Sequence, residues 1–337
     1  MNKKRWAALG IAAFIFAFSV ATSLVSTALT TDFNSLFSDI MASGNEEFTE
    51  DTLEDGNEFN KIAVLEVDGT IQDTGDTQSI LSSAGYNHKA FMKKLDKVKN
   101  DSSVKGIILK VNSPGGGVVE SAEIHDKIVE IQEAAKKPVY VSMGSMAASG
   151  GYYISAPADK IFASPETLTG SLGVIMSGYN FEGLAEKYGV EFVTIKSGPY
   201  KDIMSSTREM TDKERDILQT MIDNSYDGFV KVIADGRGLK ENEVRKIADG
   251  RIYDGRQAKD LNLIDDFGYL DDVINSMKTD NNWKDAMVVS YSDSGGFASM
   301  FGMTAKSLLS GEEKEMANIL KIATNANSPR LMYLYAE

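Results

Sequence analysis

Short apolar runs alternate with longer amphipathic stretches along the first half of the chain. Residues 62–67, 106–111 and 139–143 are rich in Val, Ile and Leu and lie beside Gly, Pro or Asn, which predicts three strands. Between them, apolar residues recur every three or four positions over residues 87–100 and 119–136, which predicts two helices. Strands separated by such helices predict βαβ units, and therefore an α/β fold with a mainly parallel sheet.

The second half of the chain continues with shorter elements. Thr211 and Glu214 have the spacing of a capping box, so a long helix is expected to begin there and to run to about residue 235. The final apolar run, residues 331–336, is unusual for an exposed tail. The other predicted strands are 160–163, 191–195 and 287–291, and the other predicted helices are 181–188, 240–248, 255–261, 269–278 and 312–323.

The N-terminal region has a different pattern. Residues 6–31 carry no charge and are long enough to cross a bilayer as a helix, which needs about 20 residues. Basic residues 3–5 precede this run and acids follow it, so the positive-inside rule places residues 1–5 in the cytoplasm and everything after residue 31 on the other side of the cell membrane. A cleaved signal peptide is the alternative. Its apolar core is only about 7–15 residues long, so the length favours a retained single-pass anchor.

Acidic residues are concentrated after this segment. Residues 32–60 contain nine acids and no base, together with Ser, Thr, Asn and Gly, and this composition predicts a flexible linker. A folded domain is then expected over residues 61–295, followed by a C-terminal helix and tail over residues 296–337. The chain has a net charge of −14 and no basic stripe, which argues against nucleic-acid binding.

The chain contains no cysteine and only two histidines, His88 and His125. Disulfides, a cysteine nucleophile and thiolate metal sites are therefore excluded, and a multi-histidine metal centre is not expected. His125 lies among charged residues on a predicted helix and is expected to be a solvated surface histidine. His88 is expected to serve local structure at a helix N-terminus. We predict no cofactor and no metal site.

Ser149 lies where the third predicted strand ends. Small residues, 144–148, precede it and two glycines follow it. This layout can present a serine nucleophile at a strand-to-helix turn, where the free N–H groups of a helix N-terminus stabilise developing negative charge. A plain connection between two core elements is the alternative. No histidine follows residue 125, so the Ser–Asp–His order of α/β-hydrolases is impossible.

A serine nucleophile without a histidine needs another base, and a lysine that burial keeps neutral can serve. Lys201 lies in a polar turn, residues 196–202, directly after the predicted strand 191–195. In α/β sheets, ligands bind beside the carboxyl ends of strands. This position gives Lys201 little advantage over the other lysines, most of which are expected to be surface charges.

Four motifs together resemble those of a known family. The first two resemble the Clp protease/crotonase superfamily, and all four, in this order, resemble the signal peptide peptidase A family. The resemblance covers about residues 61–290 and the N-terminal anchor, and the single copy of the domain is similar to the short Gram-positive form. The motifs are Asn112-Ser-Pro-Gly-Gly-Gly117, Gly144-Ser-Met-Ala-Ala-Ser-Gly-Gly-Tyr-Tyr153, Leu168-Thr-Gly-Ser-Leu-Gly-Val174 and Ser197-Gly-Pro-Tyr-Lys201.

The resemblance implies a role for five residues. Ser149 matches the family's nucleophile and Lys201 matches its general base. Gly116 and Gly150 match the two backbone N–H donors of the oxyanion hole, and a glycine can bring its N–H close to an oxyanion because it has no side chain. Ser171 matches a serine that orients the lysine.

The resemblance also implies a function. It implies a membrane-anchored Ser/Lys endopeptidase that degrades remnant signal peptides and other apolar peptides, with an apolar unprimed pocket. Such proteins form ring-shaped homo-oligomers, in which Lys201 serves Ser149 either of its own chain or of a neighbour, and residues 6–31 would lie in the lipid bilayer. The apolar C-terminal run is expected either to lie in a substrate groove or to pack on the domain surface.

Two other functions are considered. A crotonase-like enzyme would use the same oxyanion geometry on an acyl-CoA thioester, but the export-oriented anchor argues against a cytoplasmic cofactor. A catalytically inactive scaffold would bind membrane proteins, but the presence of both Ser149 and Lys201 argues against loss of activity.

Overall fold

The computed structural model describes residues 48–73, 86–293 and 331–335. Both the predicted anchor, residues 6–31, and the predicted helix 312–323 lie outside these ranges. Within the described ranges, no helix is both long and apolar enough to cross a bilayer.

The contacts within the chain divide it into two compact units. Almost all of the described residues belong to one of them, and the fold and site below are those of this unit. It comprises residues 50–291 and 310–337, and the other unit comprises residues 1–49 and 292–309.

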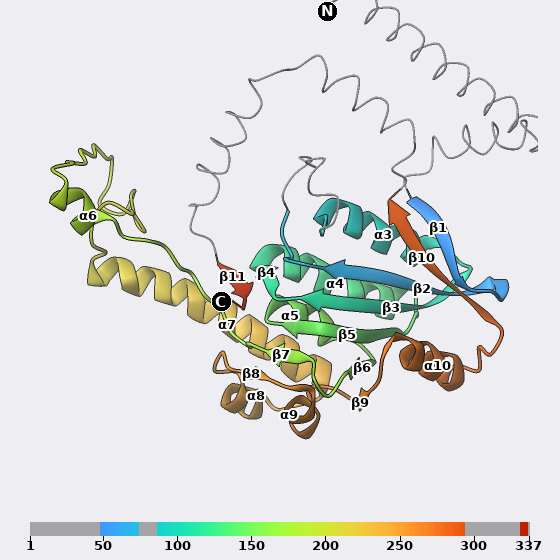
Figure 1. Cartoon of the computed structure of the whole chain (residues 1–337). Helices are drawn as coiled ribbons and strands as arrows, with labels where there is room; N and C mark the ends of the chain where they lie inside the picture. Colours follow the sequence, from blue (N-terminus) through green and yellow to red (C-terminus); the bar gives the residue numbers. More distant parts are fainter. Residues whose placement is uncertain (1–47, 74–85, 294–330, 336–337) are drawn as a thin grey trace, which may run out of the picture. The chain divides into compact units, whose positions relative to one another are not determined.

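A mainly parallel sheet forms the centre of the fold (Figure 1). Its central strand pairs, from β10 through β2, β3, β5 and β6 to β9, are all parallel, which confirms the predicted α/β class. A short strand, β7 (Leu168–Gly170), continues beside the end of β5 and pairs antiparallel with β8 (Ile252–Tyr253). The main path is β1 (Phe48–Glu54), β10 (Ala286–Asp293), β2 (Asn57–Asp68), β3 (Val104–Ser113), β5 (Val139–Ala148), β6 (Lys160–Ala163) and β9 (Asp266–Phe267).

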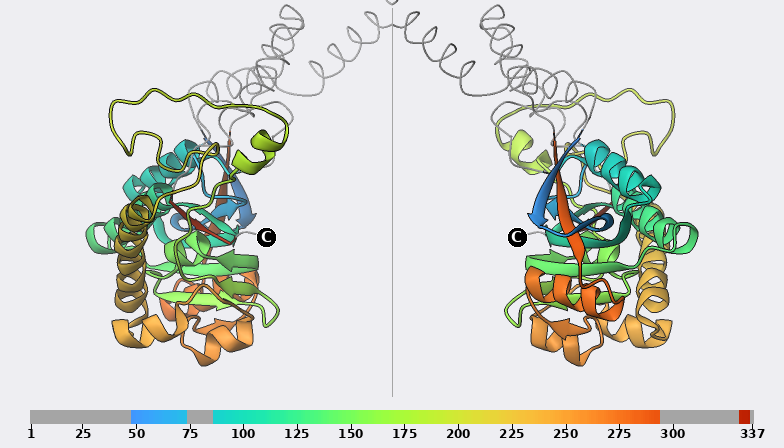
Figure 2. Two further views of the ribbon diagram at one scale, coloured as in Figure 1. Left: turned by 90° about the vertical axis from the view of Figure 1, so that its left-hand side faces the viewer. Right: turned by 90° about the vertical axis from the view of Figure 1, so that its right-hand side faces the viewer.

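Helices cover both faces of the sheet (Figure 2). On one face, α10 (Leu270–Asp280) packs Val273, Ile274 and Met277 against alternate residues of the strands, including Ile62 and Val64. The opposite face is covered by α3 (His88–Asn100), α4 (Val118–Ala134) and α5 (Gly150–Ser155). The buried residues of α3 and α4 recur at the predicted helical spacing and include Phe91, Leu95, Val98, Ile124, Ile128 and Ile131.

The predicted linker, residues 32–60, is wrong for its last part. Residues from Phe48 onward form β1 and the start of β2, whereas residues 32–47 lie outside the described ranges. The acids of β1 are paired with distant bases, because Lys61 Nζ donates to Glu50 at 2.6 Å and Lys278 Nζ to Glu54 at 2.5 Å. Acidic composition predicted solvation here, but the partners are supplied by other strands and helices.

The long helix begins as predicted. In α7 (Asp212–Arg237), Thr211 N–H donates to Glu214 Oε2 at 2.9 Å and the Glu214 N–H donates back to Thr211 Oγ1 at 3.3 Å. Gly238 ends the helix in the left-handed conformation, with φ of 62°. The helices α6 (Glu182–Lys187), α8 (Glu241–Ile247) and α9 (Gly255–Asp260) also lie where they were predicted.

The predicted strand 191–195 is wrong, and its surroundings explain why. No residue between Gly173 and Lys213 is buried, and residues 190–196 have no regular structure. A strand needs a neighbouring strand for its N–H and C=O groups, and nothing in the described chain pairs with this segment. We call residues 173–211 the arm. It extends from the body beyond the N-terminal end of α7 (Figure 1).

Candidate active site

Ser149 stands between β5 and α5. Its backbone has φ of 53° and ψ of −115°, a strained conformation for a residue other than glycine. Two bonds hold it there: the Ser149 N–H donates to Gly170 O at 2.8 Å, and the Tyr153 N–H donates to Ser149 O at 2.8 Å. Strain of about 1–3 kcal/mol is retained where the surroundings over-determine it, as at a nucleophile fixed on a sharp strand-to-helix turn.

A three-residue strand, β4 (Gly115–Gly117), lies beside this turn. A Cβ on Gly116 would stand 1.9 Å from Ile71 O, and one on Gly115, whose φ is 99°, would stand 2.6 Å from Gly150 N. Glycine is therefore the residue that fits both positions. The absence of side chains therefore lets the backbone of β4 lie close both to Ile71 and to the N–H of Gly150.

The C-terminal strand β11 (Met332–Leu334) runs antiparallel to β4, with Tyr333 opposite Gly116. On its other edge, Met332 exchanges two backbone hydrogen bonds of 3.0 Å with Ile175. The tail therefore lies between β4 and Ile175 and is hydrogen-bonded along both of its edges.

The carbonyl of Tyr333 is directed at the glycines. Successive residues of a strand point their N–H and C=O groups to opposite edges, so Tyr333 faces β4 because Met332 faces Ile175. The Tyr335 N–H donates to Pro114 O at 2.9 Å, which places Tyr333 and Gly116 in a hydrogen-bonded pair of the same ladder. Tyr333 O also lies 3.0 Å from the place of a Cβ on Gly150. A peptide carbonyl thus occupies the position predicted for the oxyanion hole.

The side chain of Tyr333 fills an aromatic pocket. Its ring centroid lies 4.8 Å from that of Tyr153 and 4.7 Å from that of Phe229, and its hydroxyl donates to Ser225 O at 3.0 Å. Burial raises the pKa of Tyr153 to about 12, so this phenol remains protonated. The pocket is apolar, as expected, with one carbonyl acceptor at its end. Sequence reasoning missed Phe229 as a site residue, because it lies 80 positions after Ser149.

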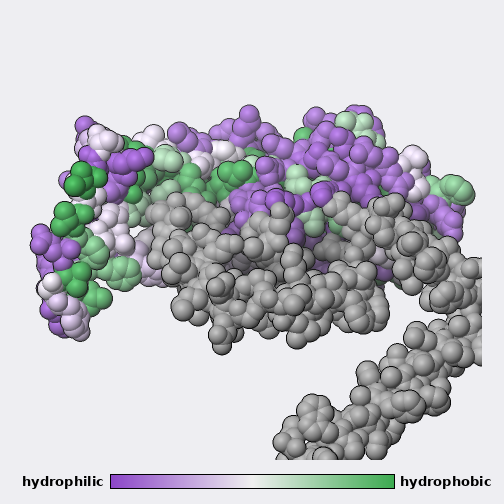
Figure 3. Space-filling view, turned by 90° about the horizontal axis from the view of Figure 1, so that it is seen from above, coloured by the Kyte–Doolittle hydropathy of each residue, from purple (hydrophilic) through white to green (hydrophobic). Residues whose placement is uncertain are grey.

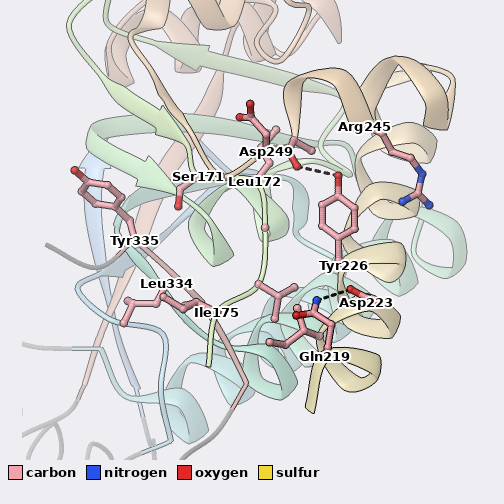
Figure 4. Close-up of a pocket in the computed structure, with 15 residues that line it drawn as sticks. Ser171, Leu172, Ile175, Gln219, Asp223, Tyr226, Arg245, Asp249, Leu334 and Tyr335 are labelled. Atoms are coloured by element: carbon pink, nitrogen blue, oxygen red, sulfur yellow. Dashed lines mark hydrogen bonds between the residues drawn. The ribbon is translucent and has the colours of Figure 1, made fainter. Parts of the chain in front are cut away.

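Ser171 is linked to Ser149 through Gly170, whose carbonyl accepts the Ser149 N–H. It too has a left-handed backbone, with φ of 50°, and its N–H donates to Arg251 O at 2.7 Å. Its hydroxyl makes no hydrogen bond with any described residue, and it lines an open pocket of about 640 Å³ (Figure 4). Leu334 and Tyr335, which follow Tyr333, line the same pocket, whereas Tyr226 and Arg245 form its other wall.

The structure does not bring Lys201 to Ser149 of the same chain. Ser149 is 1% exposed, whereas Lys201 lies exposed in the arm and its ammonium makes no hydrogen bond or ion pair with a described residue. The strand that favoured Lys201 in the sequence is also absent. Of the five predicted site residues, Ser149, Gly150, Gly116 and Ser171 lie together and Lys201 lies apart.

The two histidines are structural in this chain. His88 lies buried between the Tyr86 hydroxyl and Glu123, at 2.6 Å from each. His125 is not the solvated residue that was expected, since its ring packs edge-on against Tyr153 at 5.4 Å and its side chain is 17% exposed. Neither histidine contacts Ser149.

The assembled residues can bind an extended peptide on both edges and polarise one of its carbonyls. Ser149 directly precedes Gly150, which Tyr333 O faces, and no described residue hydrogen-bonds to the Ser149 hydroxyl. Within residues 48–73, 86–293 and 331–335, no side chain that could act as a base is hydrogen-bonded to the serine.

Comparison with known proteins gives matches to two family models. The model of peptidase family S49 matches residues 131–284, and that of Clp protease matches residues 81–169. A protein of Enterococcus faecium that bears the name signal peptide peptidase SppA is 44% identical over 308 residues, 89% of this chain and 88% of that protein.

More distant relatives bear protease names. A protein of Synechocystis sp. is 43% identical over 63% of this chain and 71% of its own length. Protease 4 of Haemophilus influenzae is 33% identical over 85% of this chain, which spans about half, 48%, of that longer protein. The chain therefore belongs to the SppA group of peptidase family S49 and is a serine peptidase.

Proposed function

We propose that the protein is an endopeptidase in which Ser149 is the nucleophile and Lys201 of a neighbouring subunit is the general base. The observation that carries the proposal is the position of the Tyr333 carbonyl, which faces Gly116 and Gly150 beside Ser149. A substrate peptide bound in place of β11 would present its scissile carbonyl there.

The geometry of α7 supports a base from another subunit. Phe229 packs on Tyr153, one helical turn from Ser149, with ring centroids 5.1 Å apart. Glu214 lies fifteen residues earlier in the same helix, and a rise of 1.5 Å per residue places it about 22 Å away. The Lys201 turn is tied to this far end of α7, and the four methylene groups of a lysine do not span such a distance.

A neighbouring copy has an entry to Ser149. The open pocket is lined by Ser171, whose neighbour Gly170 accepts the Ser149 N–H. No described residue hydrogen-bonds to the Ser171 hydroxyl, which can therefore accept an ammonium group that enters this pocket. The arm carries many exposed apolar side chains, which gather at one end of the molecule (Figure 3). Among them, Val193 is 78% exposed and Ile195 is 96% exposed. Apolar surface of this extent favours contact with another copy, and a head-to-tail contact closes into a ring.

The reaction follows from these positions. Neutral Lys201 accepts the proton of the Ser149 hydroxyl as Oγ attacks the carbonyl carbon, and the N–H groups of Gly116 and Gly150 stabilise the oxyanion. The lysine then gives its proton to the leaving amine, and an ester to Ser149 remains. Water attacks this ester, its proton passes to the lysine and then to Ser149, and the peptide acid is released.

The substrates we propose are apolar peptides, including remnant signal peptides, cleaved at the surface of the cell membrane. The aromatic pocket of Tyr153 and Phe229 supports apolar substrates. The uncharged run of residues 6–31, with bases before it and acids after it, supports an anchor with the domain outside the cytoplasm.

Subunit complementation tests the base in trans. Ser149→Ala and Lys201→Ala chains are each expected to be inactive on a fluorogenic apolar peptide. The two variants are then dissociated, mixed at a ratio of 1:1 and reassembled. In a head-to-tail ring, about one site in four then pairs an intact serine with an intact lysine from the neighbouring subunit. About a quarter of wild-type activity is therefore expected. No activity in a reassembled mixture would place the base in the same chain or elsewhere, and full activity of Lys201→Ala alone would exclude Lys201.

A further inference from the structure

The turn that carries Lys201 has no hydrophobic core of its own. No residue from Gly173 to Lys213 is buried, so apolar packing within the chain does not hold the turn in place. Its own backbone bonds are few, among them Lys201 N–H to Gly198 O at 3.3 Å and Ser205 N–H to Asp202 O at 3.0 Å. A general base must be held within a fraction of an ångström of its partner, so another interaction must fix this turn.

Arg208 supplies such an interaction. Its guanidinium holds the carboxylate of Asp202, the residue after Lys201, through Nε at 2.9 Å and Nη2 at 2.7 Å. The same guanidinium holds Glu214 through Nη1 at 2.9 Å and through Nη2. Paired N–H···O bonds of this kind fix orientation as well as distance, because the guanidinium is planar and rigid.

Both ends of this arrangement are themselves held. Glu214 is 1% exposed and accepts the N–H and the hydroxyl of Thr211, each at 2.9 Å, as part of the capping box that begins α7. Asp202 also accepts Lys196 Nζ at 2.6 Å, and its backbone oxygen accepts Arg208 Nη2 at 3.3 Å. A continuous series of hydrogen bonds therefore joins the neighbour of Lys201 to the first turn of a 26-residue helix.

We propose that Arg208, acting between Asp202 and Glu214, is the positioning residue for the general base, and that it fixes the Lys201 turn on the N-terminus of α7. The proposal rests on the proposed function, because it assumes that Lys201 is the base. The other end of α7 supplies Phe229 to the aromatic pocket. One rigid helix thus connects two functional parts of the chain. Its N-terminus holds Lys201, which acts in a neighbouring subunit, and its other end lines the peptide groove of its own subunit.

Arg208 also balances charge beside the base. Together, Lys196, Asp202, Arg208 and Glu214 have no net charge, and the nearby Lys213 ammonium lies over the Tyr200 ring at 5.8 Å. Without Arg208, the group would carry one uncompensated negative charge next to a lysine that has to lose its proton. Negative charge favours the protonated form of a lysine, so the acidic limb of the pH–rate profile would move to higher pH.

Two substitutions separate the orienting role from the charge. In the full-length oligomer, Arg208→Gln is expected to lower kcat at least tenfold with little change in KM, because the peptide groove is built from other elements. It should also move the acidic limb of the kcat profile to higher pH. Arg208→Lys keeps the positive charge but loses the planar set of N–H groups that holds both carboxylates. For this variant kcat should therefore fall, while the acidic limb of the kcat profile stays at the same pH. Arg256→Gln, which removes an exposed arginine–carboxylate pair with Glu166, is the matched control and should change neither quantity.

The outcomes distinguish this proposal from the proposed function. If Lys201→Ala is inactive and Arg208→Gln keeps kcat within twofold of the wild type, Arg208 does not position the base. If Lys201→Ala is fully active, the proposed function fails and this inference fails with it. If Arg208→Gln does not assemble, Arg208→Lys decides: a tenfold fall in kcat at unchanged KM supports the inference, and wild-type kcat overturns it.

Discussion

Replacement of Gly116 by alanine perturbs the proposed oxyanion hole by a single methyl group. A Cβ at this position would stand 1.9 Å from the oxygen and 2.5 Å from the carbonyl carbon of Ile71. Packed carbon atoms keep about 3.5 Å from their neighbours, so β4 and Ile71 would have to separate by about 1.5 Å.

The expected decrease in kcat follows from the hydrogen bonds on both sides of β4. Ile71 holds β4 through two bonds, Ile71 N–H to Gly115 O at 2.9 Å and Gly117 N–H to Ile71 O at 2.8 Å. A shift of this size carries the Gly116 N–H out of the range of about 2.7–3.2 Å in which it can donate to an oxyanion. Loss of one such donor removes roughly 3 kcal/mol of transition-state stabilisation, so kcat should fall about 100- to 1000-fold.

Steady-state hydrolysis of an apolar fluorogenic peptide measures this change, and thermal unfolding reports whether the variant is folded. Gly228→Ala is the matched control, because a Cβ at Gly228 in α7 meets nothing within 4 Å. This substitution should leave kcat unchanged and raise stability by about 0.5–1 kcal/mol, since glycine within a helix is unfavourable. A folded Gly116→Ala enzyme with kcat within threefold of the wild type would refute the assignment of Gly116 to the oxyanion hole.

Two further predictions concern the C-terminal tail and Glu214, at the start of α7. Because the Tyr333 carbonyl occupies the position proposed for the oxyanion, purified wild type should contain a species that ends at Tyr333. The Ser149→Ala variant should keep residues 334–337. Intact-mass spectrometry measures both, and identical C-termini would count against self-cleavage after Tyr333. Hydrogen bonds from Arg208 and Thr211 lower the pKa of Glu214 to about 2, whereas a glutamate in an unfolded chain has a pKa of about 4.3. Ionised Glu214 therefore stabilises the fold above about pH 4.3, and this contribution is lost as the pH falls toward 2. The difference in Tm between the wild type and Glu214→Gln should therefore be largest near pH 7 and shrink toward pH 2–3; a difference that does not change with pH would contradict this origin.

The βαβ core could be predicted because its signals are local and repeated. The apolar runs of β2, β3 and β5 and the helical spacing of Ile124, Ile128 and Ile131 each specify an element from neighbouring residues alone. The strand-to-helix turn at Ser149 could be predicted for the same reason, since strand, small residues, Ser149 and two glycines are continuous in the chain. The family resemblance then named Gly116, Gly150 and Ser171, and these come together with Ser149.

Other features depend on residues far apart in the sequence. The acids of β1 looked like a solvated linker because Lys61 and Lys278, which pair with them, cannot be assigned as partners from the sequence. Residues 191–195 have the composition of a strand, but they remain irregular because no neighbouring strand exists for them in the described chain.

The sequence by itself determined the α/β class, the strand-to-helix turn at Ser149 and the capping box that begins α7. Only the tertiary structure decided that the tail pairs with Gly116, that Phe229 and Tyr153 enclose Tyr333, and that Lys201 lies on an exposed arm away from Ser149 of its own chain. The physical reason is the range of the interactions. Turns and helix caps are fixed by residues within a few positions, whereas a groove, a pocket and the reach of a lysine depend on where a rigid 26-residue helix and the sheet place their ends.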